Sequence, residues 1–395
     1  MRRLLLAPCF LLLATTASAQ TRTTVDAEKF ASFPWEGDVR IQNFRSWETF
    51  FPVAVVHRSG EPFLFKEKPV DLPVSFEYNG KKHELSAWLD ETITTNFLVI
   101  KDDTIVYEKY FRGNTKDSKA TSMSVAKSYT SALVGICLAD GLFASVDDPI
   151  TKYVDFLKGS GYDGVPIKHI LQMSSGIDFS EKYDDPNSGI FQMVGTIAMG
   201  GSIKDYAKSL KPKTPSGQSF YYASIDTNIL GFLIEAVAKK SAAQLLEERI
   251  WGPLGMESDA YWNLDNHGNV LTFLGLNITA RDYAKFGRLY LNQGNWNGKQ
   301  IIPAQWVADS VKPDKDYLKL PDYYWKGWDI GYQYQWWVPA GDDGEFSGIG
   351  VWGQYLYVNP AQKLIIVKNS VDPGFDTRDM EAIAAFRAIG NYLSK

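Results

Sequence analysis

The chain has 395 residues, of which 45% are hydrophobic and 22% charged, and its formal net charge is −5 at pH 7. This balance excludes a disordered chain and is ample for a large buried core. The net negative charge argues against nucleic acid or an anionic membrane surface as a partner.

The first residues have the pattern of a signal peptide. Arg2 and Arg3 precede an apolar stretch, and small residues precede Gln20. We expect cleavage after Ala19, so that residues 1–19 are removed and an exported, periplasmic or secreted protein remains. No later segment approaches ~20 uninterrupted apolar residues, so no integral membrane segment is expected after cleavage.

The two cysteines agree with this expectation. A lipoprotein signal is a competing interpretation, but Cys9 comes before most of the apolar stretch rather than after it. Cleavage would leave Cys137 alone, so neither an internal disulfide nor a cysteine metal site is expected. Cys137 lies on an apolar helix face, where a small buried residue is expected rather than a reactive thiol.

Strands are predicted towards both ends of the chain. After an aromatic lead-in over residues 30–56, the segment 96–113 has two alternating apolar runs joined at Asp102 and Asp103, which is typical of a β-hairpin. Near the other end, two further apolar runs predict neighbouring antiparallel strands, followed by a closing helix. These three segments are residues 344–360, 363–370 and 378–395.

Helices and loops dominate the middle of the chain. A short helix stopped by Gly176 and two amphipathic helices are predicted, over residues 167–177, 225–241 and 241–256. The simplest fold class is α+β: an antiparallel sheet flanked by helices, with an inserted mainly helical region. We expect one domain over residues 20–395, with its sheet region at about 75–140 and 270–395 and its helical region at about 141–269.

The segment "TSMSVAKSYTSALVGICLADG", residues 121–141, places Ser124 and Lys127 at the start of an apolar helix. Residues i and i+3 share one helix face, so the hydroxyl and the amine can come within hydrogen-bond reach. We expect Ser124 to cap this helix, whose free N–H groups favour an oxyanion. Lys127 must be neutral to accept a proton, which requires burial or a neighbouring cation.

Ser-x-x-Lys alone is a weak signal, because any capped helix with a solvated lysine in its first turn matches it. The helix after Lys127 is apolar almost all round and is therefore expected to be buried, which makes a solvated lysine at its start harder to place.

Several ordered motifs give the chain a more specific resemblance. It resembles the serine hydrolases related to class C β-lactamases and D-alanyl-D-alanine carboxypeptidases, and within them the 6-aminohexanoate-dimer hydrolase and carboxylesterase-like branch. The resemblance covers nearly the whole mature chain and implies a β-lactamase/penicillin-binding-protein-like fold. The motifs are "SMSVAKS", "LQMSSGIDFSEKY", "FYYASIDTNILG", "GLNITARDYAKFGRLYLNQG" and "GIGVWGQYLYVNP".

The resemblance implies that Tyr222 is the catalytic tyrosine. Tyr221 is the adjacent rival, but the Tyr-x-Ser spacing to Ser224 favours Tyr222. Many relatives have Asn at the position of Ser224, and serine there is typical of the amide-hydrolase and esterase branch. A cationic Lys127 is expected to lower the tyrosine pKa, so that Tyr222 can transfer the proton of Ser124 to the leaving group.

The third motif departs from the family pattern. Relatives that act on β-lactams have Lys or His, then Thr or Ser, then Gly, whereas the best alignment here gives Gly348, Ile349 and Gly350. The backbone N–H of Val351, or of Ile349 if the alignment shifts, is expected to complete an oxyanion hole with that of Ser124. The absence of a cation lowers the expectation of β-lactamase or carboxypeptidase activity.

Further substrate contacts are expected from aromatic residues. Trp352 lines the pocket or is buried in the core, and Tyr183 matches a substrate-contacting tyrosine or closes a loop over the helical region. The acidic cluster of Glu181, Asp184 and Asp185 would attract an amine-bearing substrate, although a charge run in a loop is usually solvated.

Other kinds of site find no support in the sequence. None of the four histidines lies in a nucleophile-elbow setting, although a Ser-His-Asp triad is not excluded by residue order; they are His57, His83, His169 and His267. There is no His-Glu-x-x-His, P-loop or dinucleotide fingerprint, so no metal and no cofactor is expected.

These patterns predict a serine hydrolase that cleaves a small-molecule ester or linear amide through an acyl-enzyme. A β-lactamase or D-alanyl-D-alanine carboxypeptidase-type penicillin-binding enzyme is one alternative, and a non-catalytic binding or sensor protein on the same fold is another. With 12 tryptophans and 21 tyrosines, an aromatic-lined apolar pocket is expected. The acyl group, the leaving group and the oligomeric state stay open.

Overall fold

The computed structural model describes residues 24–26, 37–319 and 329–395. The expected signal peptide and the first part of the aromatic lead-in lie outside the described residues. Within the described ranges, none of the helices combines the length and the apolarity that a membrane crossing requires.

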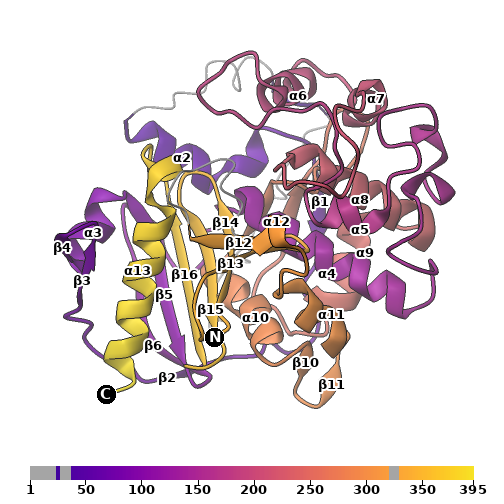
Figure 1. The fold of residues 1–395 in the computed structure, drawn as a ribbon. Coiled ribbons are helices and arrows are strands. Elements are labelled where there is room, and N and C mark those ends of the chain that lie inside the picture. Colours follow the sequence, from indigo (N-terminus) through magenta and orange to yellow (C-terminus); the bar gives the residue numbers. More distant parts are fainter. Residues whose placement is uncertain (1–23, 27–36, 320–328) are drawn as a thin grey trace, which may run out of the picture.

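The largest sheet has eight strands and joins the two ends of the described chain, with β5 beside β16 at its centre (Figure 1). Neighbouring strands are antiparallel, except that the short β2 pairs in parallel with β6. This arrangement confirms the predicted α+β fold class. In spatial order the strands are β12 (Ile330–Gln333), β13 (Trp336–Pro339), β14 (Phe346–Gly350), β15 (Gln354–Asn359), β16 (Leu364–Ser370), β5 (Thr94–Lys101), β6 (Thr104–Tyr110) and β2 (Lys66–Glu67).

Helices flank this sheet and fill the region inserted between β6 and β12. The α-helices are α2 (Val39–Arg45), α3 (Leu85–Glu91), α4 (Ala126–Ala139), α5 (Ile167–Leu171), α6 (Gly189–Ala198), α7 (Ile203–Ser209), α8 (Ser224–Ala238), α9 (Ala242–Leu246), α10 (Ala280–Leu291), α11 (Ala304–Ser310), α12 (Asp316–Lys319) and α13 (Phe375–Leu393). Short turns of other helix types are η1 (Trp47–Thr49), η2 (Met123–Val125), η3 (Ile150–Lys152), η4 (Asp155–Leu157) and η5 (Glu247–Trp251).

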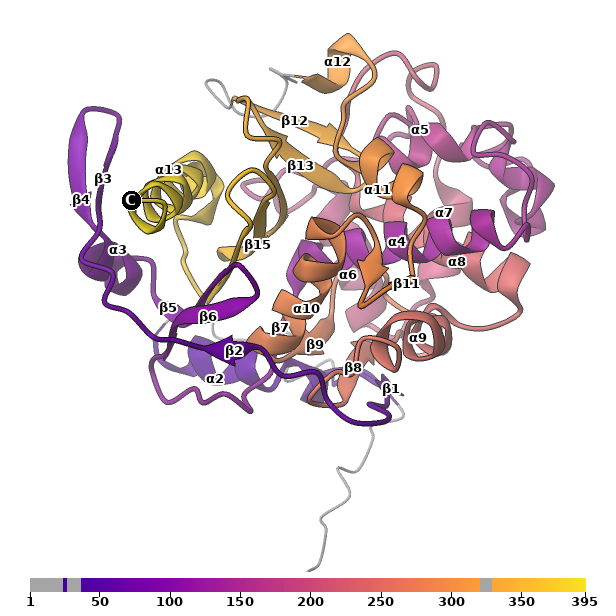
Figure 2. The same cartoon turned by 90° about the horizontal axis from the view of Figure 1, so that it is seen from below.

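Alternate side chains of the main sheet enter two separate cores, because helices cover both faces. On one face, Tyr355 of β15 packs edge-on against Phe386 of α13. On the other, Leu356 faces α10, where a Cβ on Gly287 would come within 2.9 Å of it. The glycine therefore lets α10 approach the sheet closely. Figure 2 shows the strands between α13 and α10.

The inserted region is built around α4, which is buried from Ala126 through Cys137 and packs against α8. Its apolar sequence explains this position, since a helix that is apolar all round must be surrounded by protein. Cys137 is buried there as predicted, and burial raises the pKa of its thiol to about 12. The thiol is thus unreactive near neutrality.

A second sheet was not predicted. Its order is β1-β8-β9-β7, so the aromatic lead-in forms one edge of the sheet and the segment just before Ser124 forms the other. β8 lies inside the segment predicted to be helical. The sequence did not indicate it, because a strand of four residues leaves little periodic signal. The bounds are β1 (Val53–Val56), β7 (Ala120–Thr121), β8 (Ala260–Asn263) and β9 (Leu276–Ile278), and two separate hairpins are β3 (Ser75–Tyr78) with β4 (Lys81–Glu84) and β10 (Asn295–Trp296) with β11 (Lys299–Gln300).

Most of the predicted local elements are present. The hairpin of β5 and β6 turns at Asp102 and Asp103, whose φ angles of 49° and 59° are those of a two-residue turn that suits the strand twist. The strands β14, β15 and β16 and the closing helix α13 are confirmed. The helix predicted to run to Gly176 ends at Leu171.

Candidate active site

Ser124 lies in the turn η2, directly before α4, and its hydroxyl faces Lys127. The Nζ of Lys127 is 2.8 Å from the Oγ of Ser124 and donates to the carbonyl oxygen of Phe273 at 3.1 Å. The expectation that Ser124 caps the helix is wrong, because it sits inside the turn, Val125 occupies the N-cap position and no side-chain cap bond forms. Met123, with φ 44°, makes the tight bend that presents Ser124.

Lys127 is buried, with 1% of its surface exposed. Burial lowers the pKa of its ammonium to about 7, while the negative charge of Glu181 acts in the opposite direction. A large fraction of Lys127 is therefore neutral near pH 7 and can accept a proton from Ser124.

Tyr222 is buried beside the same two residues. The Nζ of Lys127 is 5.1 Å from the centre of the Tyr222 ring, and Tyr222 and Ser124 line one small pocket together. The expected lowering of the Tyr222 pKa is wrong: burial raises it, and the opposing hydrogen bond with Ser124 does not compensate. Tyr222 is therefore a protonated donor near neutrality. The ring of Tyr221 lies instead near the ammonium of Lys213, 5.9 Å away.

A buried carboxylate connects the second motif to the loop before it. Glu181 is 2% exposed and accepts from the hydroxyl of Ser224 at 2.6 Å, from the backbone N–H of Ser224 at 2.9 Å and from the hydroxyl of Tyr183 at 2.8 Å. Burial raises its pKa, and Lys127 opposes this effect. The solvated acidic loop expected here is thus wrong for Glu181, although Asp184 is exposed.

The sequence indicates Glu181 only as a member of an acidic cluster and does not predict its hydrogen bonds with Ser224. The sequence signal for this contact is that a serine at a buried helix start needs a hydrogen-bond acceptor. The signal is weak, because Ser224 lies far along the chain from Glu181.

The glycine-rich strand β14 packs directly on η2. A Cβ on Gly350 would lie 2.8 Å from the carbonyl oxygen of Ser122 and 3.0 Å from the backbone nitrogen of Ser124. Only glycine permits this approach, and it brings the end of β14 to the nucleophile. Ile349 and Val351 both line the small pocket with Ser124, so either backbone N–H remains a candidate for the second oxyanion donor.

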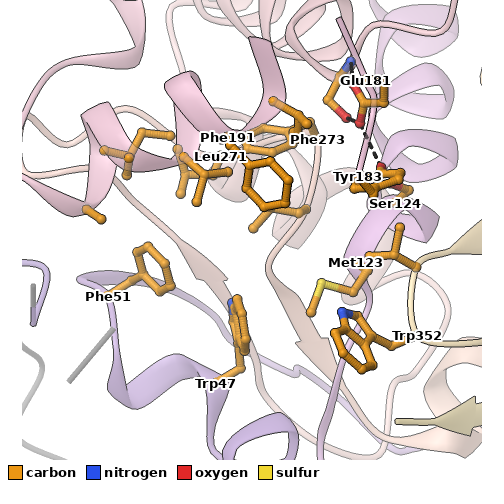
Figure 3. A pocket seen from close by; sticks show the side chains of 18 of the residues that line it. Trp47, Phe51, Met123, Ser124, Glu181, Tyr183, Phe191, Leu271, Phe273 and Trp352 are labelled. Carbon is orange, nitrogen blue, oxygen red and sulfur yellow. Dashed lines mark hydrogen bonds between the residues drawn. The ribbon is translucent and has the colours of Figure 1, made fainter. Parts of the chain in front are cut away.

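Two hollows meet at Ser124. The larger has a volume of about 620 Å³ and is lined mainly by apolar side chains. Figure 3 shows Trp47 and Phe51 on one side of it, Phe191, Leu271 and Phe273 on the other, and Ser124 at one end. Trp352 and Tyr183 line it as well. The smaller hollow, of about 40 Å³, lies between Tyr222, Trp337, Ile349, Asp376 and Asp379.

No histidine is among the described residues that line either hollow. In the described part of the chain, no group of three or more His, Cys, Asp or Glu side chains is arranged to hold a metal ion.

The Beta-lactamase family model matches residues 89–388. The chain belongs to this family. Among its relatives, the 6-aminohexanoate-dimer hydrolase of Paenarthrobacter ureafaciens is 31% identical over 304 residues, which cover 75% of this chain and 77% of the relative. A provisionally named D-alanyl-D-alanine carboxypeptidase from Escherichia coli is 24% identical over 49% of this chain and 50% of its own length.

Two solved structures are similar to this chain. A Bacillus anthracis protein, provisionally named a 6-aminohexanoate-dimer hydrolase, superposes with a TM-score of 0.82 over 91% of this chain and 96% of its own, at 25% identity. EstCE1, described as a hydrolase with promiscuous acyltransferase activity, shares the fold at a TM-score of 0.60, 14% identity, 77% of this chain and 96% of its own. The chain is thus a hydrolase of the β-lactamase fold.

Proposed function

We propose that this protein cleaves a small ester or linear amide through a covalent ester on Ser124, with Lys127 and Tyr222 as the proton-transferring groups. The observation that carries the proposal is the buried amine of Lys127, 2.8 Å from the Oγ of Ser124, with a pKa of about 7. Burial of a lysine destabilises the fold, and groups whose pKa is perturbed in this way cluster at functional sites.

In the first step the Oγ of Ser124 forms a bond to the substrate carbonyl carbon, and its proton passes to neutral Lys127. The carbonyl π electrons move to oxygen and form an oxyanion. The N–H of Ser124, together with that of Val351 or Ile349, would stabilise this charge, because the close approach at Gly350 brings β14 to η2.

When the tetrahedral intermediate collapses, the bond to the leaving group breaks and its oxygen or nitrogen needs a proton. Tyr222, protonated and beside Lys127, supplies that proton and regains one from the lysine. Water then attacks the acyl carbon and gives a proton to the same pair. The bond between this carbon and the Oγ of Ser124 breaks, the Oγ takes up that proton, and the acid is released.

A β-lactamase or carboxypeptidase would need to hold a substrate carboxylate. Among the described residues that line the small hollow there is no Lys, Arg or His, whereas Asp376 and Asp379 are present. A carboxylate placed there would find no positively charged partner among these residues. The named activity of the Paenarthrobacter relative supports a linear amide as one substrate class, and the departure in the third motif supports the same branch.

The decisive experiment compares a short-chain p-nitrophenyl ester, a linear aminohexanoate-type amide and a chromogenic cephalosporin, each with native protein and with Ser124→Ala. We expect turnover of the ester or the amide that is lost in Ser124→Ala while the melting temperature is retained. Cephalosporin turnover would favour the β-lactamase alternative. Failure of a fluorophosphonate probe to label Ser124, with tight ligand binding, would favour a binding protein.

A further inference from the structure

We infer that the preferred substrate carries a long, uncharged apolar acyl chain and a small leaving group, an inference that rests on the proposed serine hydrolase function. The two hollows at Ser124 differ more than tenfold in volume, about 620 Å³ against about 40 Å³. A carbonyl held at Ser124 must therefore extend its larger substituent into the larger hollow, called here the acyl cavity.

The acyl cavity is walled by three segments of the chain. One is the apolar stripe of α6, with Phe191, Val194, Gly195 and Ala198 at helical spacing, so that they share a face. The second is the aromatic lead-in, which contributes Trp47 and Phe51 from outside the residues matched by the family model. The third is the loop of Leu271, Phe273 and Leu274, in which the carbonyl oxygen of Phe273 accepts the hydrogen bond from Lys127.

The walls of the acyl cavity carry too few charged groups to favour an ionic acyl chain. Among the described residues that line it, Glu181 is the one charged side chain, and both of its oxygens accept hydrogen bonds from Ser224 or Tyr183. An ammonium at the end of an acyl chain would have to lose its water on walls that are apolar except at Glu181, whose carboxylate already accepts three hydrogen bonds.

The position of Tyr222 sets the direction of the substrate. Tyr222 must reach the leaving group to protonate it, and it lines the small hollow and not the acyl cavity. The leaving group therefore occupies the small hollow, and the acyl chain occupies the cavity. At the mouth of the cavity, Phe191 and Met199 are 42% and 87% exposed, which extends the apolar surface outwards.

Two series of esters test the inference on the native protein. Methyl esters with acyl chains from acetyl to dodecanoyl vary the part placed in the cavity, and acetate esters of methanol to octanol vary the leaving group. We expect kcat/KM to rise about fourfold per methylene along the acyl series until the cavity is filled, the value of a buried methylene. The alcohol series should show no such rise. A flat acyl series, or a rise confined to the alcohol series, overturns the inference.

A matched pair of substrates tests the charge. Methyl hexanoate and methyl 6-aminohexanoate share their length and differ by one ammonium group. We expect the uncharged ester to be preferred at least tenfold in kcat/KM. Equal rates, or preference for the amino ester, overturn the inference.

A variant shortens the cavity from within. A Cβ on Gly195 would meet no protein atom within 4 Å, so Gly195→Leu can project over the stripe of α6 without a clash. We expect the ratio of dodecanoyl to acetyl kcat/KM to fall at least tenfold in Gly195→Leu and less in Gly195→Ala. Gln192→Leu, on the exposed face of the same helix, should keep the native ratio. An unchanged ratio in a folded Gly195→Leu contradicts the placement of the chain.

Fluorophosphonate labelling separates this inference from the function on which it rests. If Ser124 is labelled and esters are hydrolysed without regard to acyl length, the inference alone fails. If Ser124 is neither labelled nor required for turnover, the proposed function fails, and the inference falls with it.

Discussion

The pH dependence of acylation tests the buried lysine most directly. Burial lowers the pKa of Lys127 to about 7, and only its neutral form can take the proton of Ser124. For a neutral ester, kcat/KM should therefore rise with pH and be half-maximal near pH 7. From the neutral fraction of such a group, the rate should be about one tenth of its maximum at pH 6 and about one hundredth at pH 5.

Replacing Glu181 by Gln perturbs this profile in a direction that the structure fixes. The carboxylate of Glu181 raises the pKa of Lys127 against the larger effect of burial, so its removal should move the half-maximal pH lower. The amide cannot accept all the hydrogen bonds that Ser224 and Tyr183 now donate, so we also expect a loss of about 1–3 kcal/mol in the free energy of unfolding.

Initial rates between pH 4.5 and 9, with the rate of fluorophosphonate labelling as a second measure, would give both midpoints. Asp184→Asn is the matched control, because it removes an exposed carboxylate from the same loop and should leave the midpoint in place. A native midpoint above pH 9, or an upward shift in Glu181→Gln, would refute the assignment of Lys127 as the base.

Three further results are expected. Tyr222→Phe should lower kcat/KM by about 10²–10⁴ on the same ester, whereas Tyr221→Phe should stay within a few-fold; equal losses would contradict the choice of Tyr222. Lys127→Met should abolish turnover yet raise the free energy of unfolding by about 1–3 kcal/mol near pH 7. Because the pKa of Lys127 is lower in the folded state, the free-energy cost of burying its charge is largest below pH 7 and fades towards pH 10.5. Near pH 7 this cost is about 4 kcal/mol, which exceeds the contribution of the lost hydrogen bond to Phe273. Denaturant unfolding at pH 7 and pH 10 would therefore show a smaller gain in stability at the higher pH. Expression with the full N-terminus should yield an exported protein that begins at Gln20, and a retained N-terminus would contradict the signal-peptide prediction.

Local patterns predicted those parts of the fold whose signal lies within a few residues. Alternation predicted the strands of the hairpin that turns at Asp102 and Asp103, and the i, i+3 spacing predicted the contact of Ser124 with Lys127. Motif order then placed Tyr222 beside them. The second sheet was missed because strands as short as β7 hold too few residues to show a period.

The remaining parts of the site depend on contacts between distant segments. In sequence, Glu181 resembles any loop carboxylate. Tyr183 donates to it from the same loop, but the two hydrogen bonds from Ser224 come from a distant segment. The walls formed by Trp47 and Phe51 come from a lead-in with no motif that ties it to the nucleophile. Local sequence favoured capping of α4 by Ser124, but Ser124 lies inside the turn η2 and does not cap the helix.

The pairing of β5 with β16 also sets the order of events during synthesis. About 260 residues separate the end of β5 at Lys101 from the start of β16 at Leu364, so at ~5–20 residues per second the ribosome delivers the second strand roughly 13–52 seconds after the first. Until then β5 has no partner on that side, and β14, which closes on Ser124, has not been made. A nascent chain can form the contact between Ser124 and Lys127 early, yet it can acquire a complete site only at the end of translation.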